Sequence, residues 1–398
     1  MIRDDFPILS TLVKKNKLVY FDNAASTQKP KQVIDAISNY YLAQNSNIHR
    51  GAHYLANLAT DAYENVRIKL ANFIGAKSNE VIFTSGTTAS INLLMQSWGR
   101  KFLKNGDNVV LTEMEHHANI VPWIALQSEI GFEIRYIPMD KDCQLDLNKI
   151  DSIIDSNTKL LSMAYVSNAI GTIHPIQKII SKAKTVNSLV HLDCAQAIQH
   201  QKINIDHLNV DFISFSSHKM YGPMGIGVFW GKEELLNEMN PFLYGGEMIQ
   251  DVFLDKVTYN KIPYKFEAGT PNVADVIGLG AAVDYIKAIG IEKIIEIETD
   301  LHRYFLEKIK SIPNVLCLTP DHSCSVVSFN VRDIHAFDLG QLLDSKGIAV
   351  RTGTHCCQPL MRALNIEGSC RASISFYNTK EEIDYFIKSL EEIIPILL

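Results

Sequence analysis

The stretch VDFISFSSHKMYGPMGIGVFWG, residues 210–231, joins two short apolar segments through a turn that carries Ser216, His218 and Lys219. Each apolar segment has the length and composition of a buried strand, and glycines end the turn. A lysine in a turn is usually a solvated charge. It can also form a Schiff base with an aldehyde, provided that its surroundings lower its pKa. The stretch therefore predicts a strand–turn–strand unit that holds a candidate reactive lysine at a strand end.

The segments around this unit alternate between strand-like and helix-like patterns. Strand-like runs followed by a turn or a helix lie within 80–98, 107–123, 158–175 and 189–198. This alternation predicts an α/β fold with a mainly parallel sheet. The pattern changes after about residue 262, where strands are expected at 325–331, 347–353 and 370–377, with helices between and after them. Thr379 and Glu382 have the spacing of a capping box at the start of the last helix.

Length and composition limit the possible functions. The 398 residues suggest two domains of roughly 100–200 residues each, and the net charge of −6 argues against a nucleic-acid partner. No apolar run is long enough to span a membrane, and Asp4 and Asp5 argue against a secretory signal. Seven scattered cysteines predict no disulfide framework and no metal site, so a reducing cytoplasm is expected.

Polar residues gather where the predicted strands end. Because ligands bind at the carboxyl ends of strands in open α/β sheets, these residues are expected to line one cleft. They are Thr87, Thr88, His116, Asn168, Asp193, Gln196 and Lys219.

Together these residues fit one cofactor. Asp193, after an apolar strand, is either a helix N-cap or the partner of a pyridinium nitrogen. TSGTTASIN (84–92) offers N–H and hydroxyl donors for a phosphate at a helix N-terminus. Either His116 or His117 could stack on a ring. With Lys219 they predict pyridoxal 5′-phosphate (PLP).

Several motifs carry a resemblance to a known family: YFDNAASTQKP (20–30), EHHANIVPW, VSNAIGT, DCAQA, SSHKMYGPMGIG, FEAGTPN, RTGTHCCQPL and CRASISFYNTKEEID. They are similar to the motifs of class V aminotransferases, which are fold-type I PLP enzymes, and within that class to SufS-type (group II) cysteine desulfurases. The resemblance runs nearly end to end. It implies a PLP-binding large domain with a mainly parallel seven-stranded sheet (17–262), a smaller α+β C-terminal domain (263–398), and an N-terminal arm (1–16) that packs with the small domain.

The resemblance also implies residue roles. Lys219 would bind PLP covalently and move the substrate's α-proton, Asp193 and Gln196 would contact the ring nitrogen and the phenolic oxygen, and His116 would stack on the ring and act in acid–base steps. The phosphate would be held by Thr87, Thr88, Ser216 and His218, together with Thr270 from the other subunit of a homodimer. The substrate would be met by Asn168 and Arg371, which would bind its carboxylate, and by Arg351, His49 and Arg50, which would line the cleft.

The implied activity converts L-cysteine to L-alanine, with the sulfur held as a persulfide on a cysteine. The family pattern aligns Cys356 with the nucleophile and Cys357 with a small residue, typically alanine. Adjacent side chains of an extended segment point to opposite sides, so only Cys356 is expected to face the cofactor. His355 need not face Cys356 and is not assigned as its base.

The loop that holds Cys356 is short, which predicts that an acceptor must come to collect the sulfur. The expected partners are a SufE- or SufU-like protein and a SufBCD-type scaffold for iron–sulfur cluster assembly. Three alternatives remain open. The same site could act as a selenocysteine lyase, the chain could be a kynureninase-like or transaminating enzyme of the same class, or it could be a non-catalytic scaffold in iron–sulfur assembly.

Overall fold

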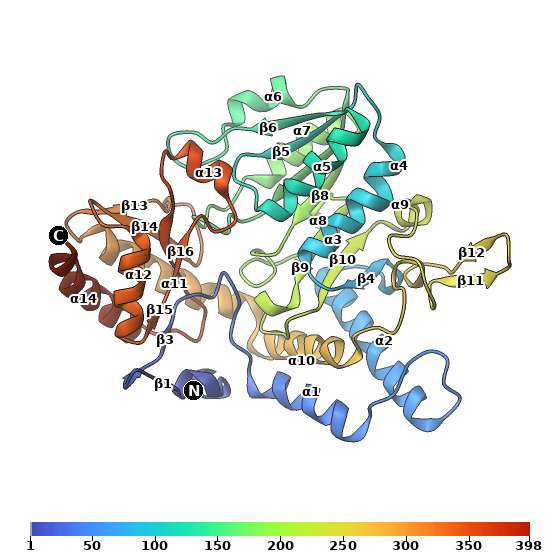
Figure 1. Ribbon diagram of the computed structural model, residues 1–398, viewed down its shortest axis with the longest axis horizontal. Helices are drawn as coiled ribbons and strands as arrows, with labels where there is room; N and C mark the ends of the chain where they lie inside the picture. Colours follow the sequence, from blue (N-terminus) through green and yellow to red (C-terminus); the bar gives the residue numbers. More distant parts are fainter. Residues whose placement is uncertain (1) are drawn as a thin grey trace.

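A computed structural model describes residues 2–398 (Figure 1). Its centre is a seven-stranded sheet with the order β4-β10-β9-β8-β7-β5-β6. Only β10 runs antiparallel to its neighbours, and the other adjacent pairs are parallel. The predicted α/β fold with a mainly parallel sheet is therefore confirmed. The strands are β4 (Val81–Thr84), β5 (Asn108–Thr112), β6 (Glu133–Ile137), β7 (Thr158–Ala164), β8 (Leu189–Asp193), β9 (Phe212–Ser216) and β10 (Gly227–Gly231).

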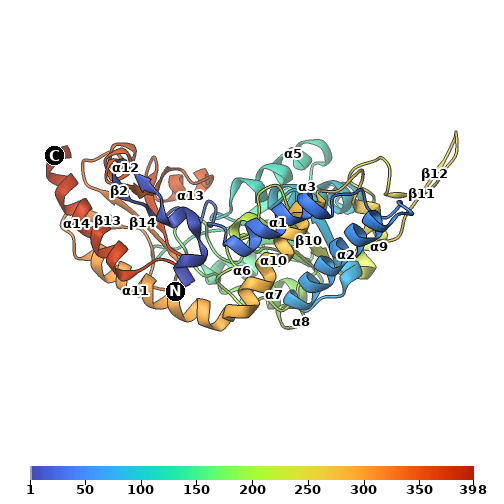
Figure 2. The ribbon, with the colours of Figure 1, turned by 90° about the horizontal axis from the view of Figure 1, so that it is seen from below.

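Helices cover both faces of this sheet (Figures 1 and 2). Strand β5 shows why: Val109 and Leu111 pack with α3 and α5, whereas Val110 packs in the core on the opposite face with α7. Alternate residues of a strand face opposite sides, so a strand covered on both faces is apolar throughout. The helices of this part are α1 (Lys31–Ala43), α2 (Tyr54–Ile74), α3 (Thr87–Leu94), α4 (Arg100–Phe102), α5 (Val121–Ile130), α6 (Ile150–Ile153), α7 (Ile176–Thr185), α8 (Ile205–Leu208), α9 (Glu233–Glu238) and α10 (Val273–Ile289).

The C-terminal part is built on a four-stranded antiparallel sheet with the order β13-β14-β17-β16. The capping box of Thr379 and Glu382 starts its last helix, as the sequence predicts. A second hydrophobic core joins this sheet to its helices. The elements are β13 (Val315–Cys317), β14 (Val326–Val331), β16 (Arg351–Gly353), β17 (Ser369–Ser373), α11 (Ile291–Lys310), α12 (Ala336–Ser345), α13 (Gln358–Ala363) and α14 (Lys380–Leu397).

One predicted strand, 347–353, is divided between two sheets. Its first part, β15 (Ile348–Ala349), pairs in parallel with β3 (Val19–Tyr20), and only its second part, β16, pairs with β17. The division follows from the N-terminal segment, whose Val19 and Phe21 N–H groups donate to the carbonyls of residues 347 and 349.

The boundaries of the two predicted domains stay predictions. The second core takes its residues from Val19, Phe21 and the chain beyond Leu301, while α10 packs against α1 and α2 of the large sheet's side. In the predicted arm, the aromatic ring of Phe6 packs on that of Tyr377 and Arg3 forms an ion pair of 2.7 Å with Glu382.

Two short hairpins complete the described chain. One is formed by β1 (Leu12–Val13) and β2 (Asn16–Lys17), and the other by β11 (Ile249–Val252) and β12 (Val257–Tyr259). The hairpin of β11 and β12 projects from the large sheet's side (Figure 2). Within residues 2–398 no helix is both long and apolar enough to cross a membrane.

Candidate active site

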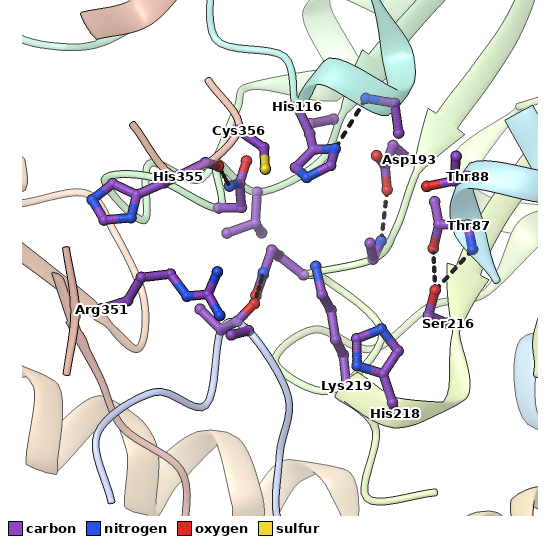
Figure 3. A pocket seen from close by; sticks show the side chains of 18 of the residues that line it. Thr87, Thr88, His116, Asp193, Ser216, His218, Lys219, Arg351, His355 and Cys356 are labelled. Carbon is purple, nitrogen blue, oxygen red and sulfur yellow. Dashed lines mark hydrogen bonds between the residues drawn. The ribbon is translucent and has the colours of Figure 1, made fainter. Parts of the chain in front are cut away.

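A pocket lies where β7, β8 and β9 end and the loop after β16 comes close (Figure 3). Almost all of the predicted site residues line it, although they come from distant parts of the chain. They are Thr87, Thr88, His116, Asn168, Asp193, Gln196, Ser216, His218, Lys219, Arg351, Cys356 and Arg371.

Lys219 ends the short turn that follows β9, and its amine points into the pocket (Figure 3). Burial lowers its pKa to about 8, although the nearby Asp193 carboxylate opposes this effect. The preceding carbonyl, that of His218, accepts hydrogen bonds from Thr27 N at 3.0 Å and from Lys29 Nζ at 2.9 Å. The turn is thus fixed, and the amine has the lowered pKa that Schiff-base chemistry requires.

Asp193 is the last residue of β8 and is buried. Its Oδ1 accepts a hydrogen bond from Ala195 N at 2.8 Å, and within residues 2–398 it forms no ion pair. Burial raises the pKa of this carboxyl, although the Ala195 N–H and the nearby charge of Lys219 oppose the effect. A buried carboxylate needs a cationic or hydrogen-bonding partner, and a protonated pyridine nitrogen would supply one. Gln196 lies beside it, with Nε2 bonded to Ala24 O at 2.7 Å, and its Oε1 has no hydrogen-bond partner in the described part of the chain.

His116 forms one wall of the pocket (Figure 3). Its Nδ1 accepts a hydrogen bond from Ala118 N at 3.0 Å, which leaves the ring proton on Nε2. Burial, and then the charge of Lys219, lower its pKa to about 3. The ring is therefore neutral near pH 7 and can lie against the flat face of an aromatic cofactor.

The N-terminus of α3 forms a cup suited to a phosphate. Ser216 Oγ accepts from Thr87 N at 2.8 Å and lies 2.7 Å from Thr87 Oγ1. Thr88 and His218 line the same end of the pocket. Strand β10 passes directly beneath this cup. The approach is so close that a Cβ on Gly227 would lie 2.4 Å from Gly86 Cα. The donors at a helix N-terminus suit an anion, and the close approach of β10 requires glycine.

Arg371 on β17 lies at the other end of the pocket and is 2% exposed. It donates to Asn168 O at 2.7 Å and to Asp22 Oδ1 at 3.2 Å, while its Nε has no hydrogen-bond partner within residues 2–398. Arg351 also donates to Asp22, at 3.3 Å. A guanidinium that lines a pocket can bind a carboxylate, so this end of the pocket suits the carboxylate of an amino acid.

Cys356 and Cys357 have opposite environments. Cys356 is exposed and its Sγ points into the pocket (Figure 3), whereas Cys357 is fully buried. The extended backbone assumed from the sequence is wrong, because His355 and Cys356 have φ angles of 51° and 56° in a turn. The turn, rather than strand alternation, separates the two thiols. The His355 ring bonds to Ser369 Oγ at 2.9 Å and not to Cys356.

Three predicted residues do not line this pocket in the single chain. His49 Nε2 contacts Glu64 Oε1 at 2.9 Å, and Arg50 pairs with Glu247 at 2.9 Å. Thr270 is exposed between the end of η8 (Tyr264–Phe266) and α10.

Three residues that the sequence reasoning did not single out belong to the site. Asp22 holds both arginines, and its position after the apolar run 18–21 is a signal like the one that identified Asp193. Lys29 braces the Lys219 turn, and burial lowers its pKa to about 7. Glu115 is buried behind His116, where burial raises its pKa to about 7. Nothing in the local pattern distinguishes Lys29 from a surface lysine.

Comparison with known proteins agrees with this geometry. The family model for class-V aminotransferases matches residues 19–386. A protein named cysteine desulfurase from Wigglesworthia glossinidia brevipalpis is 47% identical over 392 residues, which cover 98% of this chain and 96% of that protein.

Two solved structures cover all of this chain and 98% of their own. One is the apo structure of a cysteine desulfurase from Thermococcus onnurineus NA1, with a TM-score of 0.95 and 38% identity. The other is the cysteine desulfurase CsdA (S-sulfonic acid) from Escherichia coli, with a TM-score of 0.93 and 34% identity. The pocket, the fold and these matches confirm the predicted resemblance, and the chain belongs to the aminotransferase class-V family, with pyridoxal 5′-phosphate as its cofactor.

Proposed function

We propose that the protein is a cysteine desulfurase, which converts L-cysteine to L-alanine and holds the sulfur as a persulfide on Cys356. The observation that carries this proposal is the exposed Cys356 thiol in the same pocket as the Lys219 amine. A transaminating or kynureninase-like enzyme needs no thiol at this position. A non-catalytic scaffold needs neither a lysine with a lowered pKa nor an acidic partner for the cofactor.

The pocket can orient an amino acid by its carboxylate. Arg371 lines the pocket with its guanidinium, and the backbone carbonyl of Asn168 holds that group. When bound, PLP withdraws electrons from the substrate, so that the α-proton becomes acidic and the bond from carbon to sulfur weakens. Lys219, with a pKa of about 8, can accept that proton and return it. The neutral His116 ring keeps water from one face of the site.

The sulfur step requires a thiolate at Cys356. The thiolate attacks the sulfur of the substrate, an S–S bond forms, and the bond between that sulfur and the β-carbon breaks. The electron pair of the broken bond stays with the β-carbon. That carbon then takes up one proton to become the methyl group of alanine, and this proton equals the one that Cys356 lost. No external oxidant is needed, because the substrate carbon is reduced as the two sulfur atoms become linked.

The neighbouring thiol is a poor nucleophile. Burial raises the pKa of Cys357, and its Sγ lies 3.2 Å from Asn168 Oδ1 and 3.3 Å from the carbonyl of Glu115. A buried thiol that contacts two oxygen acceptors stays protonated, and the thiolate is the reactive form.

Mass spectrometry after incubation with L-cysteine tests the proposal. The peptide that contains residues 356–357 should gain the mass of one sulfur atom, and alanine should be released. The adduct should be absent in Cys356→Ala and present in Cys357→Ala. An adduct that disappears only in Cys357→Ala would overturn the assignment, and alanine release by Lys219→Ala would overturn the role of the lysine.

We further propose that the persulfide passes to a SufE- or SufU-like acceptor and then to a SufBCD-type scaffold for iron–sulfur cluster assembly. The short segment between β16 and α13 supports this, since it leaves Cys356 little freedom to carry sulfur away from the pocket. Adding such an acceptor should accelerate alanine production. If no acceptor of either kind does so, the proposal fails.

The remaining details of the function are proposals of the same kind. Seven free cysteines support a reducing cytoplasm as the location. The exposed Thr270 supports a homodimer in which this residue reaches the neighbouring pocket. L-selenocysteine differs from L-cysteine only in the chalcogen, so the same pocket should release selenium and alanine from it, which alanine measurements with both substrates would test.

A further inference from the structure

The turn that presents Cys356 has an unfavourable backbone. His355 and Cys356 are consecutive residues with φ angles of 51° and 56°. Side chains other than glycine, asparagine and aspartate seldom adopt this left-handed conformation, and two in succession persist only where surrounding contacts hold them. The question is which residue supplies those contacts.

His117 forms two hydrogen bonds to this turn, in opposite directions. Its backbone N–H donates to the carbonyl of Cys356 at 2.8 Å, and its ring Nε2 accepts from the backbone N–H of Gln358 at 3.0 Å. The two bonds lie on either side of Cys357. His117 starts the short turn η5 (His117–Asn119) on the large sheet's side, whereas Cys356 lies between β16 and α13 of the C-terminal part.

Asn168 holds the same turn from the other direction. Its Nδ2 donates to the carbonyl of His355 at 2.7 Å, and its Oδ1 lies 3.2 Å from Cys357 Sγ. His117 and Asn168 therefore fix the carbonyls of the two left-handed residues. The ring of His117 is the part of this arrangement that has no other assignment, since of the adjacent pair His116 and His117 only His116 lines the pocket.

The ring must be neutral to accept a hydrogen bond at Nε2. Burial lowers the pKa of His117, which favours the neutral form. When Nε2 accepts, the ring proton is on Nδ1. The geometry therefore gives the side chain the role of a hydrogen-bond acceptor toward the turn.

We propose that His117 is a positioning residue: its ring clamps the Cys356 turn to the large sheet's side and so fixes Cys356 Sγ in the pocket. This inference rests on the proposed role of Cys356 as the sulfur acceptor. It assigns His117 a part in aiming that thiol and none in binding the substrate or the cofactor. Without the ring contact, the turn relaxes toward a more favourable backbone and the thiol spends more time outside the pocket.

The test measures the reactivity of Cys356 in the full-length protein with its cofactor bound and without substrate. Alkylation by iodoacetamide is followed by mass spectrometry of the peptide that contains residues 356–357, with Cys356→Ser giving the contribution of Cys357. His117→Leu keeps the bulk but has no acceptor, and His117→Gln can offer its Oε1 near the position of Nε2. The backbone bond from residue 117 remains in both variants, so they differ only in the ring contact.

His117→Leu should raise the alkylation rate of Cys356 about fivefold, which is the effect expected for the net loss of one hydrogen bond. His117→Gln should stay near the original rate. His335→Ala is the matched control, because His335 Nδ1 also accepts a backbone N–H, that of Phe337 at 3.3 Å, at a helix start that does not line the pocket. The control should leave the rate unchanged.

Turnover gives a second readout. Because the clamp aims the thiol rather than the substrate, His117→Leu should lower kcat for alanine release and leave KM nearly unchanged, and His117→Gln should restore kcat. Should His117→Leu not fold, as judged by its melting temperature, His117→Ala takes its place. Equal alkylation rates in the original, Leu and Gln proteins would overturn the clamp, as would a Gln variant that behaves like Leu.

The two proposals fail in different ways. Alkylation of Cys356 needs no turnover, so a changed rate without any persulfide would leave the clamp standing and remove the desulfurase function. A persulfide on Cys356 together with an unchanged alkylation rate in His117→Leu would leave the desulfurase function standing and remove the clamp.

Discussion

At the scale of single residues, burial gives chemically identical side chains different environments in the site. Cys356 and Cys357 are adjacent thiols, yet one is exposed in the pocket and the other is fully buried against Asn168 and Glu115. The sequence predicted which of them faces the pocket, but through an extended backbone that is absent. The left-handed turn could not be predicted, because it depends on contacts with His117 and Asn168 from distant segments.

Lys219 gives a prediction at the same scale. An ordinary lysine has a pKa of ~10.4, whereas burial lowers that of Lys219 to about 8. The neutral amine is the reactive form, and its fraction rises as the pH increases through the pKa. In cofactor-free protein, the reaction of Lys219 with an acylating reagent should therefore be half-maximal near pH 8 and approach its maximum about one to two pH units higher.

Mass spectrometry of the Lys219 peptide after brief labelling from pH 6 to 11 would measure this. The same peptide, labelled after denaturation in urea, is the control and should follow the profile of an ordinary lysine. Coincident profiles for the folded and the denatured protein would contradict a pKa lowered by burial.

At the scale of elements, the positions of the strand ends explain why much of the site could be predicted from the sequence. Strands β8 and β9 are short, apolar and parallel, so Asp193 and Ser216 end at one edge of the sheet. The local pattern carries this information because strand length and polarity are both local. The divided strand of β15 and β16 is the contrary case, since its partner β3 lies near the other end of the chain.

A second prediction concerns strand β10, which leaves no room for a side chain beneath the phosphate cup. A Cβ at position 227 would lie 2.4 Å from Gly86 Cα, which is backbone and cannot move aside cheaply. In most strands a change from glycine to alanine is favourable. Here Gly227→Ala should instead reduce the free energy of unfolding by about 1–3 kcal/mol, as overpacking does, and should weaken the retention of PLP by displacing the N-terminus of α3.

Urea unfolding and the PLP content after dialysis would measure the two effects. Gly245→Ala is a suitable control, because its added Cβ would lie 3.9 Å from Ala268 Cβ, an ordinary contact. If both variants unfold at the same urea concentration and retain PLP equally, the phosphate cup does not depend on the close approach of β10.

At the scale of the whole molecule, one chain brings together most of the predicted site residues but not all of them. The pocket already joins the end of the large sheet to Arg371 and Cys356 from the C-terminal part. His49 and Arg50 are bonded to Glu64 and Glu247 instead. Their predicted roles came from resemblance alone, and the sequence gives no local signal for a contribution from another chain.

Thr270 allows the proposed homodimer to be tested through its active sites. The residue is exposed and does not line the pocket of its own chain. If it holds the phosphate in the neighbouring subunit, a mixed dimer of Thr270→Ala and Lys219→Ala chains contains one intact site. That site combines Lys219 of the first chain with Thr270 of the second, and the other site lacks both residues.

The experiment mixes the two differently tagged variants, purifies the mixed dimer and measures the retention of PLP and the release of alanine. Lys219→Ala alone should be inactive, and Thr270→Ala alone should lose PLP more readily than the original protein, since one hydrogen bond to a charged group contributes about 1.5–3 kcal/mol. The mixed dimer should hold PLP in its intact site as tightly as the original protein and show about half of its activity, because only one of two sites turns over. A mixed dimer that loses PLP as readily as Thr270→Ala would show that the threonine serves its own chain, and a protein that stays monomeric would exclude a shared site altogether.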